Sequence, residues 1–184
     1  GKRGTDGKIA AIKFARINKI PFLGICYGMQ MAIIEFARNK LNLKKATSSE
    51  FDKKGLAIIG LMNEWNKDGK KIKGTDKNLG GTMRLGSYDA KLLKNSMIQK
   101  IYGKNLIKER HRHRYEVNIA FKEKFEKNGM NFSGLSPDGN LPEIIELKNH
   151  PWFIGVQFHP EFKSRPLAPH PLFSSFIKAS KNHK

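Results

Sequence analysis

A short apolar run that ends in a glycine-flanked cysteine constrains the fold of this chain more than any other feature. Residues 22–26 are almost wholly apolar, which is typical of a strand covered on both faces, as in a parallel sheet. Amphipathic helical spacing precedes the run in residues 7–18 and resumes in residues 29–39. The order helix, buried strand, tight turn and helix predicts an α/β domain.

Weaker patterns fill the rest of the 184 residues. Apolar or alternating runs between turn residues predict strands at 56–65, 110–117, 132–134, 143–147 and 152–158. Helical spacing predicts helices at 92–102, 118–127 and 172–180. Polar or glycine-rich composition predicts a loop at 66–77, a mobile or tightly turned segment at 80–86, and turns at 137–139 and 148–151. No repeat or linker divides the sequence, so one domain is expected.

The composition narrows the classes of partner. There are 35 Lys and Arg residues against 16 Asp and Glu, a net charge of +19, but the lysines are scattered and no nucleic-acid-binding motif occurs. A solvated basic surface is therefore favoured over a nucleic-acid site. No apolar run approaches the roughly 18 residues of a membrane helix, so no membrane partner is predicted. The single cysteine excludes an intrachain disulfide and suits a reducing compartment, the cytoplasm.

Cys26 is the predicted nucleophile, because it lies between Gly24 and Gly28 at the strand-to-helix turn. Such a turn exposes a nucleophile, and its glycines allow strand and helix to pack closely. The positive end of the following helix is expected to lower the pKa of the thiol. The backbone N–H of Tyr27 is expected to face a developing oxyanion. The alternative is a buried structural cysteine, the usual state of a lone cysteine.

His159 and Glu161 are the predicted partners of this cysteine. They follow the apolar run 152–156, and polar residues at the carboxyl ends of buried strands are where α/β sites collect. Residues two apart in extended chain leave the same face, so Glu161 can hold the His159 ring while the ring moves a proton. The alternative is a structural histidine, but the combination with Cys26 favours catalysis.

Arginine and histidine alternate in segment 110–114. In a strand, the three arginines would share one face and the two histidines the other. A row of guanidinium groups suits a carboxylate or phosphate, whereas a solvated basic edge strand would discourage aggregation, and the spacing decides for neither. His111 and His113 have no cysteine or carboxylate at zinc-binding spacing, so no metal site is predicted.

Taken together, these motifs resemble the class I (triad-type) glutamine amidotransferases, and within them the glutaminase domains of the CTP synthase family. The arginine-rich segment and the glycine-bracketed segment are specific to that family within the class. The resemblance extends over essentially the whole chain. It rests on GICYGMQ at 24–30, SEF at 49–51, GGTMRLG at 80–86, ERHRHRYEVN at 109–118, SPDG at 136–139, HPWF at 150–153 and QFHPEF at 157–162.

The resemblance implies a three-layer fold, with a central, mostly parallel sheet and helices on both of its faces. It also implies a reaction in which the cysteine attacks the side-chain amide of L-glutamine, releases ammonia and leaves a glutamyl thioester that water hydrolyses. Cys26 would be the nucleophile, His159 the general acid–base and Glu161 the carboxylate that orients it.

By position, the resemblance also assigns substrate residues. Glu50 would bind the amino group of glutamine and Arg114 its carboxylate, which agrees with the one anion and one cation that an amino acid requires. The segment 80–86 would be a lid that responds to GTP, an activator in this family. The glutamine site would be lined by Tyr27, Gly28, Met29 and Gln30, and the lid residues would be Gly80, Gly81 and Arg84.

Further expectations concern what lies outside the sequence. In the family, an N-terminal synthase domain uses ATP, UTP and Mg²⁺, the full-length protein is a homotetramer, and the glutaminase domain itself needs no cofactor. None of the synthase domain is present, and Gly1 resembles the last glycine of a loop that supplies an oxyanion donor. We therefore expect residues 1–184 to be a glutaminase domain whose first strands are missing, with little activity alone.

Three other interpretations stay open at this point. A different class I amidotransferase, or a γ-glutamyl hydrolase of the same fold, would share the nucleophile turn. A papain-like protease has a similar separation between cysteine and histidine but a different sequence around the cysteine. An inactive fragment could bind an intact synthase without chemistry.

Overall fold

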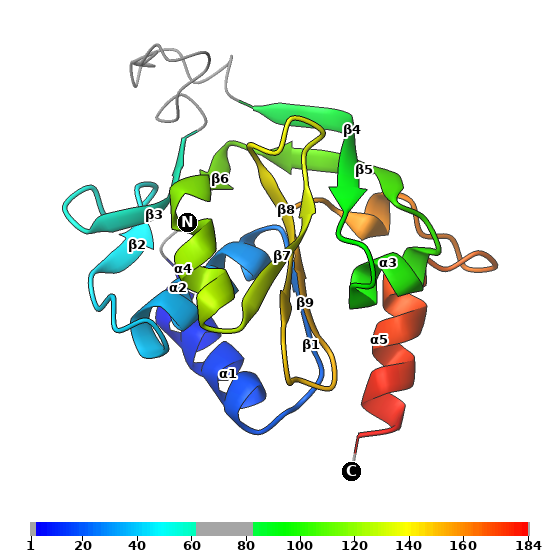
Figure 1. Cartoon of the computed structure of the whole chain (residues 1–184), viewed down its shortest axis with the longest axis horizontal. Helices are drawn as coiled ribbons and strands as arrows, with labels where there is room; N and C mark the ends of the chain where they lie inside the picture. Colours follow the sequence, from blue (N-terminus) through cyan, green and yellow to red (C-terminus); the bar gives the residue numbers. More distant parts are fainter. Residues whose placement is uncertain (1–2, 62–82, 184) are drawn as a thin grey trace.

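The computed structural model describes residues 3–61 and 83–183, which form a six-stranded sheet, a three-stranded sheet and helices packed around them (Figure 1). The elements in chain order are α1 (Thr5–Ile17), β1 (Phe22–Ile25), α2 (Tyr27–Asn39), β2 (Ala46–Ser48), β3 (Leu56–Leu61), β4 (Arg84–Leu92), α3 (Met97–Tyr102), β5 (Leu106–His113), β6 (Tyr115–Val117), the 3₁₀ turn η3 (Ile119–Phe121), α4 (Lys122–Lys127), β7 (Met130–Leu135), β8 (Pro142–Leu147), β9 (Phe153–Val156), the 3₁₀ turn η4 (Pro160–Phe162) and α5 (Pro171–Lys181).

The strands of the larger sheet follow the order β1-β9-β8-β7-β4-β5. Within the described residues, β1 and β9 pair in parallel, and every other pair in this sheet is antiparallel. The expectation of a mostly parallel sheet is therefore wrong for this part of the chain. The reason is connection length, because short turns join β7 to β8 and β8 to β9, whereas a parallel crossover needs a dozen or more residues.

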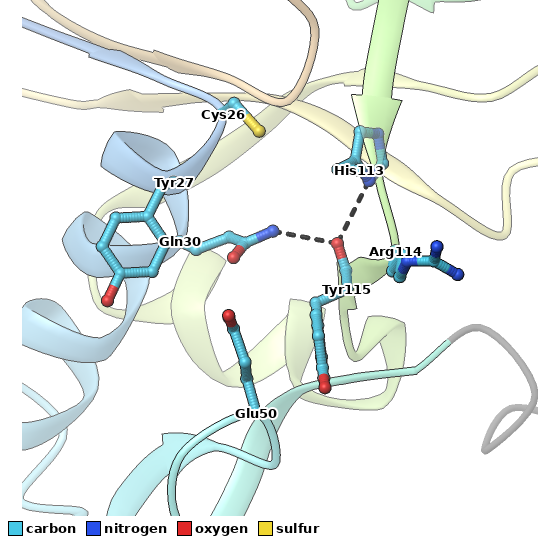
Figure 2. Close-up of a pocket in the computed structure, with 7 residues that line it drawn as sticks. All are labelled: Cys26, Tyr27, Gln30, Glu50, His113, Arg114 and Tyr115. Atoms are coloured by element: carbon cyan, nitrogen blue, oxygen red, sulfur yellow. Dashed lines mark hydrogen bonds between the residues drawn. The ribbon is translucent and has the colours of Figure 1, made fainter. Parts of the chain in front are cut away.

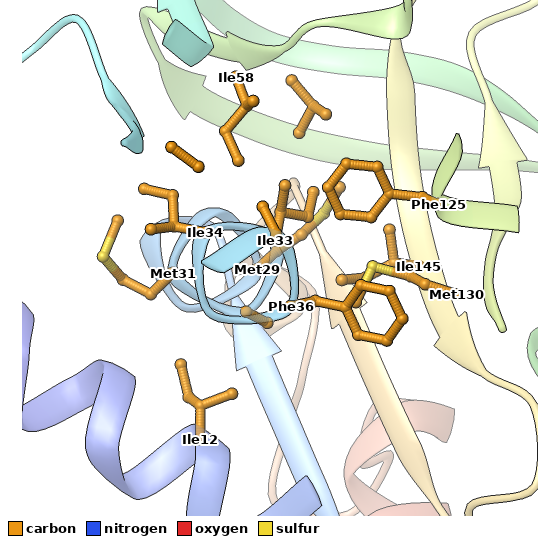
Figure 3. Close-up of a cluster of buried hydrophobic side chains, with 14 of the residues drawn as sticks. Ile12, Met29, Met31, Ile33, Ile34, Phe36, Ile58, Phe125, Met130 and Ile145 are labelled. Atoms are coloured by element: carbon orange, nitrogen blue, oxygen red, sulfur yellow. The ribbon is translucent and has the colours of Figure 1, made fainter. Parts of the chain in front are cut away.

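Helices cover both faces of the larger sheet, which confirms the three-layer α/β class (Figure 1). Alternation along the central strands separates the two cores: Ile145 and Phe153 pack with α1 and α2, while Ile144 and Ile154 pack with α3 and α5. Figure 3 shows the first core, in which α2 is surrounded by apolar side chains. This burial holds α2 against the sheet directly behind the cysteine turn.

Three predicted elements differ from the structure. The strand expected at 110–117 is broken at Arg114 into β5 and β6, which lie in different sheets. Residues 84–86, expected in a mobile or tightly turned segment, begin strand β4 and pair with β5. The helix expected from residue 92 begins only at Met97, because β4 runs to Leu92 and Ser96 caps the helix by accepting from the N–H of Gln99. The loop expected at 66–77 lies outside the described residues. Within those residues, no helix is long and apolar enough to cross a membrane.

Candidate active site

The turn between β1 and α2 holds Cys26 in an uncommon backbone conformation, with φ 50° and ψ −99°. A non-glycine residue in this region is strained, and such residues cluster at functional sites. The neighbouring strand fixes the turn, since the N–H of Cys26 donates to the carbonyl of Val156 at 2.7 Å. On the other side, the N–H of Gln30 donates to the carbonyl of Cys26 at 3.2 Å, which begins the helix.

Gly24 allows the close approach that this turn requires. A Cβ atom at Gly24 would lie 2.8 Å from the backbone carbon of Gly28 and 2.9 Å from a ring carbon of Phe22. A Cβ atom at Gly28 would meet nothing within 4 Å. The two glycines that flank Cys26 therefore have different roles, and Gly24 is the one demanded by packing.

We expect Gly24→Ala to lower the free energy of unfolding by about 1–3 kcal/mol, the range for overpacking a tight site. Urea unfolding followed by circular dichroism measures this change. Gly28→Ala is the matched control and should leave the midpoint nearly unchanged. Equal losses in the two variants would contradict the packing role assigned to Gly24.

His159 lies at the same sheet edge as Cys26. Strands β1 and β9 are parallel neighbours with Ile25 opposite Val156, so both chains leave the sheet side by side. The Nδ1 atom of His159 lies 2.6 Å from Oε1 of Glu161, as expected for an orienting carboxylate. The Nε2 atom of His159 is buried and has no hydrogen-bond partner among residues 3–61 and 83–183, so it is available to exchange a proton.

The thiol of Cys26 is not activated in the way that the sequence indicated. Its pKa is raised to about 11, mainly by burial; the carboxylates of Glu116 and Glu161 also raise it, while the Tyr27 N–H and the Gln157 side chain lower it. The expectation of a lowered pKa is therefore wrong, because desolvation outweighs the helix N-terminus. At neutral pH the resting group is a thiol, and it needs a base to become a nucleophile.

A cavity of about 220 Å³ opens beside the cysteine (Figure 2). It brings together four of the six predicted substrate residues with the nucleophile, although they come from distant parts of the chain. Met29 is not among them, because its side chain is fully buried in the first core, and Gly28 is also absent from the lining. The lining residues are Cys26, Tyr27, Gln30, Glu50, His113, Arg114 and Tyr115.

Glu50 and Arg114 reach this cavity from different elements. Glu50 follows β2, and its carboxylate points toward the space between Tyr27 and Tyr115 (Figure 2). Arg114 lies at the break between β5 and β6, and its guanidinium extends away from Cys26 in the same view. The carboxylate of Glu50 thus faces the cavity, whereas the guanidinium of Arg114 points away from the cysteine. Their roles in binding stay predictions.

Three residues at the site were not predicted from the sequence: His113 and Tyr115, which line the cavity, and Gln157, which contacts Cys26. Gln157 follows β9, is fully buried, and places Nε2 3.6 Å from the Cys26 sulfur. In the sequence, the position of this glutamine two residues before the predicted base is a signal that it lies near the nucleophile. The two others could not be found in this way, because alternation in segment 110–114 does not say which face is covered.

Arg84 lies in a buried group of charges, in which the carboxyls of Glu116 and Glu143 also approach His113 and His111. It is 4% exposed, pairs with Glu143 at 2.8 Å and Glu116 at 3.1 Å, and stacks on the ring of Tyr88. Burial opposes its charge, but the two carboxylates outweigh burial and raise the pKa of Arg84. The expectation that Arg84 lies in a loop is wrong, because the carboxylates anchor it inside the sheet. Gly80 and Gly81 lie outside the described residues.

The histidines of segment 110–114 face inward, and Arg110 and Arg112 face solvent. Burial, together with the charge of Arg84, lowers the pKa of His111 to about 2 and that of His113 to about 3, so both rings are neutral at physiological pH. Their Nδ1 and Nε2 atoms lie 2.9 Å apart in a hydrogen bond. Among residues 3–61 and 83–183, no group of three or more His, Cys, Asp or Glu side chains could hold a metal ion.

Known proteins share the sequence and the fold of this chain. The family model for glutamine amidotransferase class-I matches residues 1–179. The chain is 88% identical over 184 residues to a CTP synthase of Pelagibacter ubique, covering all of this chain and 34% of that protein. It is 61% identical to a CTP synthase of Zymomonas mobilis over 181 residues, covering 98% of this chain and 33% of that protein.

Among solved structures, the chain is similar to the glutaminase domain of Trypanosoma brucei CTPS with bound acivicin. The TM-score is 0.86 at 38% sequence identity, and the match covers 100% of this chain and 69% of that chain. The chain thus spans about a third of the length of the curated relatives it matches. With a class I match from residue 1 to 179 and this structural likeness, the chain belongs to the class I glutamine amidotransferase family.

Proposed function

We propose that this chain is the glutaminase part of a CTP synthase, which hydrolyses L-glutamine to glutamate and ammonia. The observation that carries the proposal is the cavity that the strained Cys26 lines together with Glu50 and Arg114, in a chain 88% identical to a CTP synthase. Glu50 would pair with the amino group of the substrate and Arg114 with its carboxylate. The side-chain amide would then reach the sulfur.

The chemistry begins with proton transfer from the Cys26 thiol to Nε2 of His159, while the sulfur attacks the amide carbon of glutamine. Glu161 stabilises the imidazolium through Nδ1. The backbone N–H of Tyr27 donates to the oxyanion of the tetrahedral intermediate. The C–N bond then breaks, His159 returns its proton to the leaving nitrogen as ammonia departs, and a glutamyl thioester remains. Water, deprotonated by His159, attacks the thioester, releases glutamate and restores the thiol.

The rest of the longer protein would use this ammonia. In the proposed enzyme, a synthase domain would aminate UTP to CTP with ATP and Mg²⁺, GTP would activate glutamine hydrolysis, and the full-length chains would form a homotetramer in the cytoplasm. The mechanism above needs no cofactor in the glutaminase part. L-Glutamine and the synthase domain are therefore the partners we propose.

A hybrid enzyme tests this proposal. This chain replaces the matching 184 residues of the Pelagibacter ubique CTP synthase, and CTP formation is measured with glutamine or with ammonium chloride as the nitrogen source. We expect both nitrogen sources to support CTP formation. Cys26→Ala should abolish the glutamine-dependent reaction and leave the ammonia-dependent reaction intact, because only the first needs the thiol.

The ammonia-dependent rate serves as the internal control for folding and assembly. A hybrid that makes CTP from ammonia but not from glutamine would contradict the proposed function. A hybrid that hydrolyses glutamine without making CTP from it would point to a different class I amidotransferase.

A further inference from the structure

Gln157 is the buried polar side chain next to the nucleophile that the proposed mechanism does not use. It is 0% exposed, and its Nε2 atom lies 3.6 Å from the sulfur of Cys26. Its backbone N–H donates to the carbonyl of Glu143 at 2.8 Å, which fixes the chain just after β9. A glutamine amide has a donor end and an acceptor end, so its effect on the sulfur depends on which end faces that sulfur.

Neighbouring hydrogen bonds answer this question. The carbonyl oxygen of Tyr115 can only accept, so the group of Gln30 that lies 2.9 Å from it must be the amide nitrogen Nε2. That nitrogen also lies 3.1 Å from the Gln157 side chain, and it must donate there as well, so the Gln157 atom facing it is the oxygen Oε1. The remaining end of Gln157, its N–H donor, therefore faces the sulfur.

A second chain of hydrogen bonds holds the Tyr115 carbonyl in place. Nδ1 of His113 lies 3.2 Å from that carbonyl and must donate to it, which leaves Nε2 of His113 as the acceptor for Nδ1–H of His111 at 2.9 Å. Nε2 of His111 is then an acceptor that faces the Glu143 carboxyl at 3.5 Å. These bonds fix one arrangement of donors from His111 to Gln157.

We propose that Gln157 is a catalytic residue, whose amide N–H donates to the sulfur of Cys26 and stabilises the thiolate as His159 removes its proton. This inference rests on the proposed function and adds a residue to it. A hydrogen bond to an ionised acceptor is stronger than one to a neutral acceptor. The contact therefore favours the thiolate over both the thiol and the thioester that follows it.

The surroundings of the sulfur give this donor its importance. Burial and the carboxylates of Glu116 and Glu161 all disfavour a negative sulfur, and the groups that favour it are the Tyr27 N–H and the Gln157 side chain. The Tyr27 N–H is also assigned to the oxyanion of the tetrahedral intermediate. Gln157 is the donor that stays with the sulfur when the oxyanion forms.

Alkylation of the thiol by iodoacetamide tests the inference directly, because Cys26 is the single cysteine of the chain. The rate is measured from about pH 6 to pH 10 by mass spectrometry, and it follows the thiolate fraction. Gln157→Met keeps the volume and removes the donor, so we expect alkylation about tenfold slower at pH 8, the size of a lost hydrogen bond to a charged group. Gln157→Glu should be slower still, because it replaces the donor by an acceptor that can carry negative charge.

Gln99→Met is the matched control, since Gln99 lies in α3 and donates to Asn105 rather than to the site. An unchanged pH profile in a folded Gln157→Met chain, with folding checked by circular dichroism, would overturn the inference. Where neither Gln157 variant folds, Gln30→Leu decides, because it removes the donor that fixes the amide. Slower alkylation supports the inference, and an unchanged rate overturns it.

Iodoacetamide needs neither glutamine nor a working glutamine pocket. A chain that fails to hydrolyse glutamine can still show slower alkylation in the Gln157 variants. That result would contradict the proposed function and support the role of Gln157. A hybrid enzyme that uses glutamine, with alkylation insensitive to Gln157, would remove this inference alone.

Discussion

Replacing His159 by alanine is expected to slow glutamine hydrolysis in the hybrid enzyme by about 10⁴-fold. The pKa of Cys26 is about 11, so at neutral pH the thiolate fraction without a base is on the order of 10⁻⁴. The substitution also removes the acid that protonates the leaving ammonia. Glutamate release measured with saturating glutamine gives the change in kcat.

The matched control is His183→Ala, because His183 is exposed beyond α5 and far in sequence from the site. Its rate should equal that of the unaltered hybrid. Ammonia-dependent CTP formation should be the same in both variants. A His159→Ala enzyme that retains more than about a tenth of the glutamine-dependent rate would contradict the assignment of His159 as the base.

Replacing Arg84 by methionine is expected to lower the free energy of unfolding by about 3–5 kcal/mol, the cost of breaking a buried ion pair. Arg84 is 4% exposed and pairs with the buried carboxylates of Glu116 and Glu143. Methionine fills much of the volume and leaves both carboxyls without their cation. Urea unfolding measures the loss, and Arg110→Met, an exposed arginine on the neighbouring strand β5, should change stability little.

The loss at Arg84 should also grow as the pH rises. Burial raises the pKa of Glu116 from 4.5 to about 8 even beside Arg84, so between those values the folded chain holds a proton that the unfolded chain releases. A carboxyl raised in this way contributes stability below its unfolded pKa and loses it as pH rises through the folded one. Without Arg84, the pKa of Glu116 rises further, so the penalty grows above about pH 8, where the unaltered folded chain has released this proton and the variant still holds it. A penalty that stays constant or falls above pH 8 would contradict this arrangement of charges.

The cysteine turn could be predicted from the sequence because its evidence is local. Gly24, Cys26 and Gly28 lie within five residues, and the packing of one glycine against the other is a short-range contact. The pairing of His159 with Glu161 is equally local and was confirmed. The direction of the Cys26 pKa shift was not predicted correctly, because burial depends on the whole fold and outweighs the helix terminus.

The errors arise where a residue's environment comes from distant segments. Arg84 lies in a glycine-bracketed stretch, but its strand partner His113 and its carboxylate partners are about thirty or more residues away. Met29 belongs to the cysteine turn in sequence, yet the first core buries its side chain. The orientation of the Gln157 amide is set by Gln30 and Tyr115, which are more than forty residues away in the sequence. No local pattern contains such contacts.

Labelling with acivicin, the compound bound in the similar glutaminase domain of Trypanosoma brucei CTPS, tests the central claim most directly. The chain is incubated with the compound, with and without excess glutamine, and the adduct is mapped by mass spectrometry. We predict a single adduct on Cys26 that glutamine suppresses and that Glu50→Gln weakens. A folded chain whose Cys26 reacts with iodoacetamide but never with acivicin would contradict the claim that this cavity is a glutaminase site.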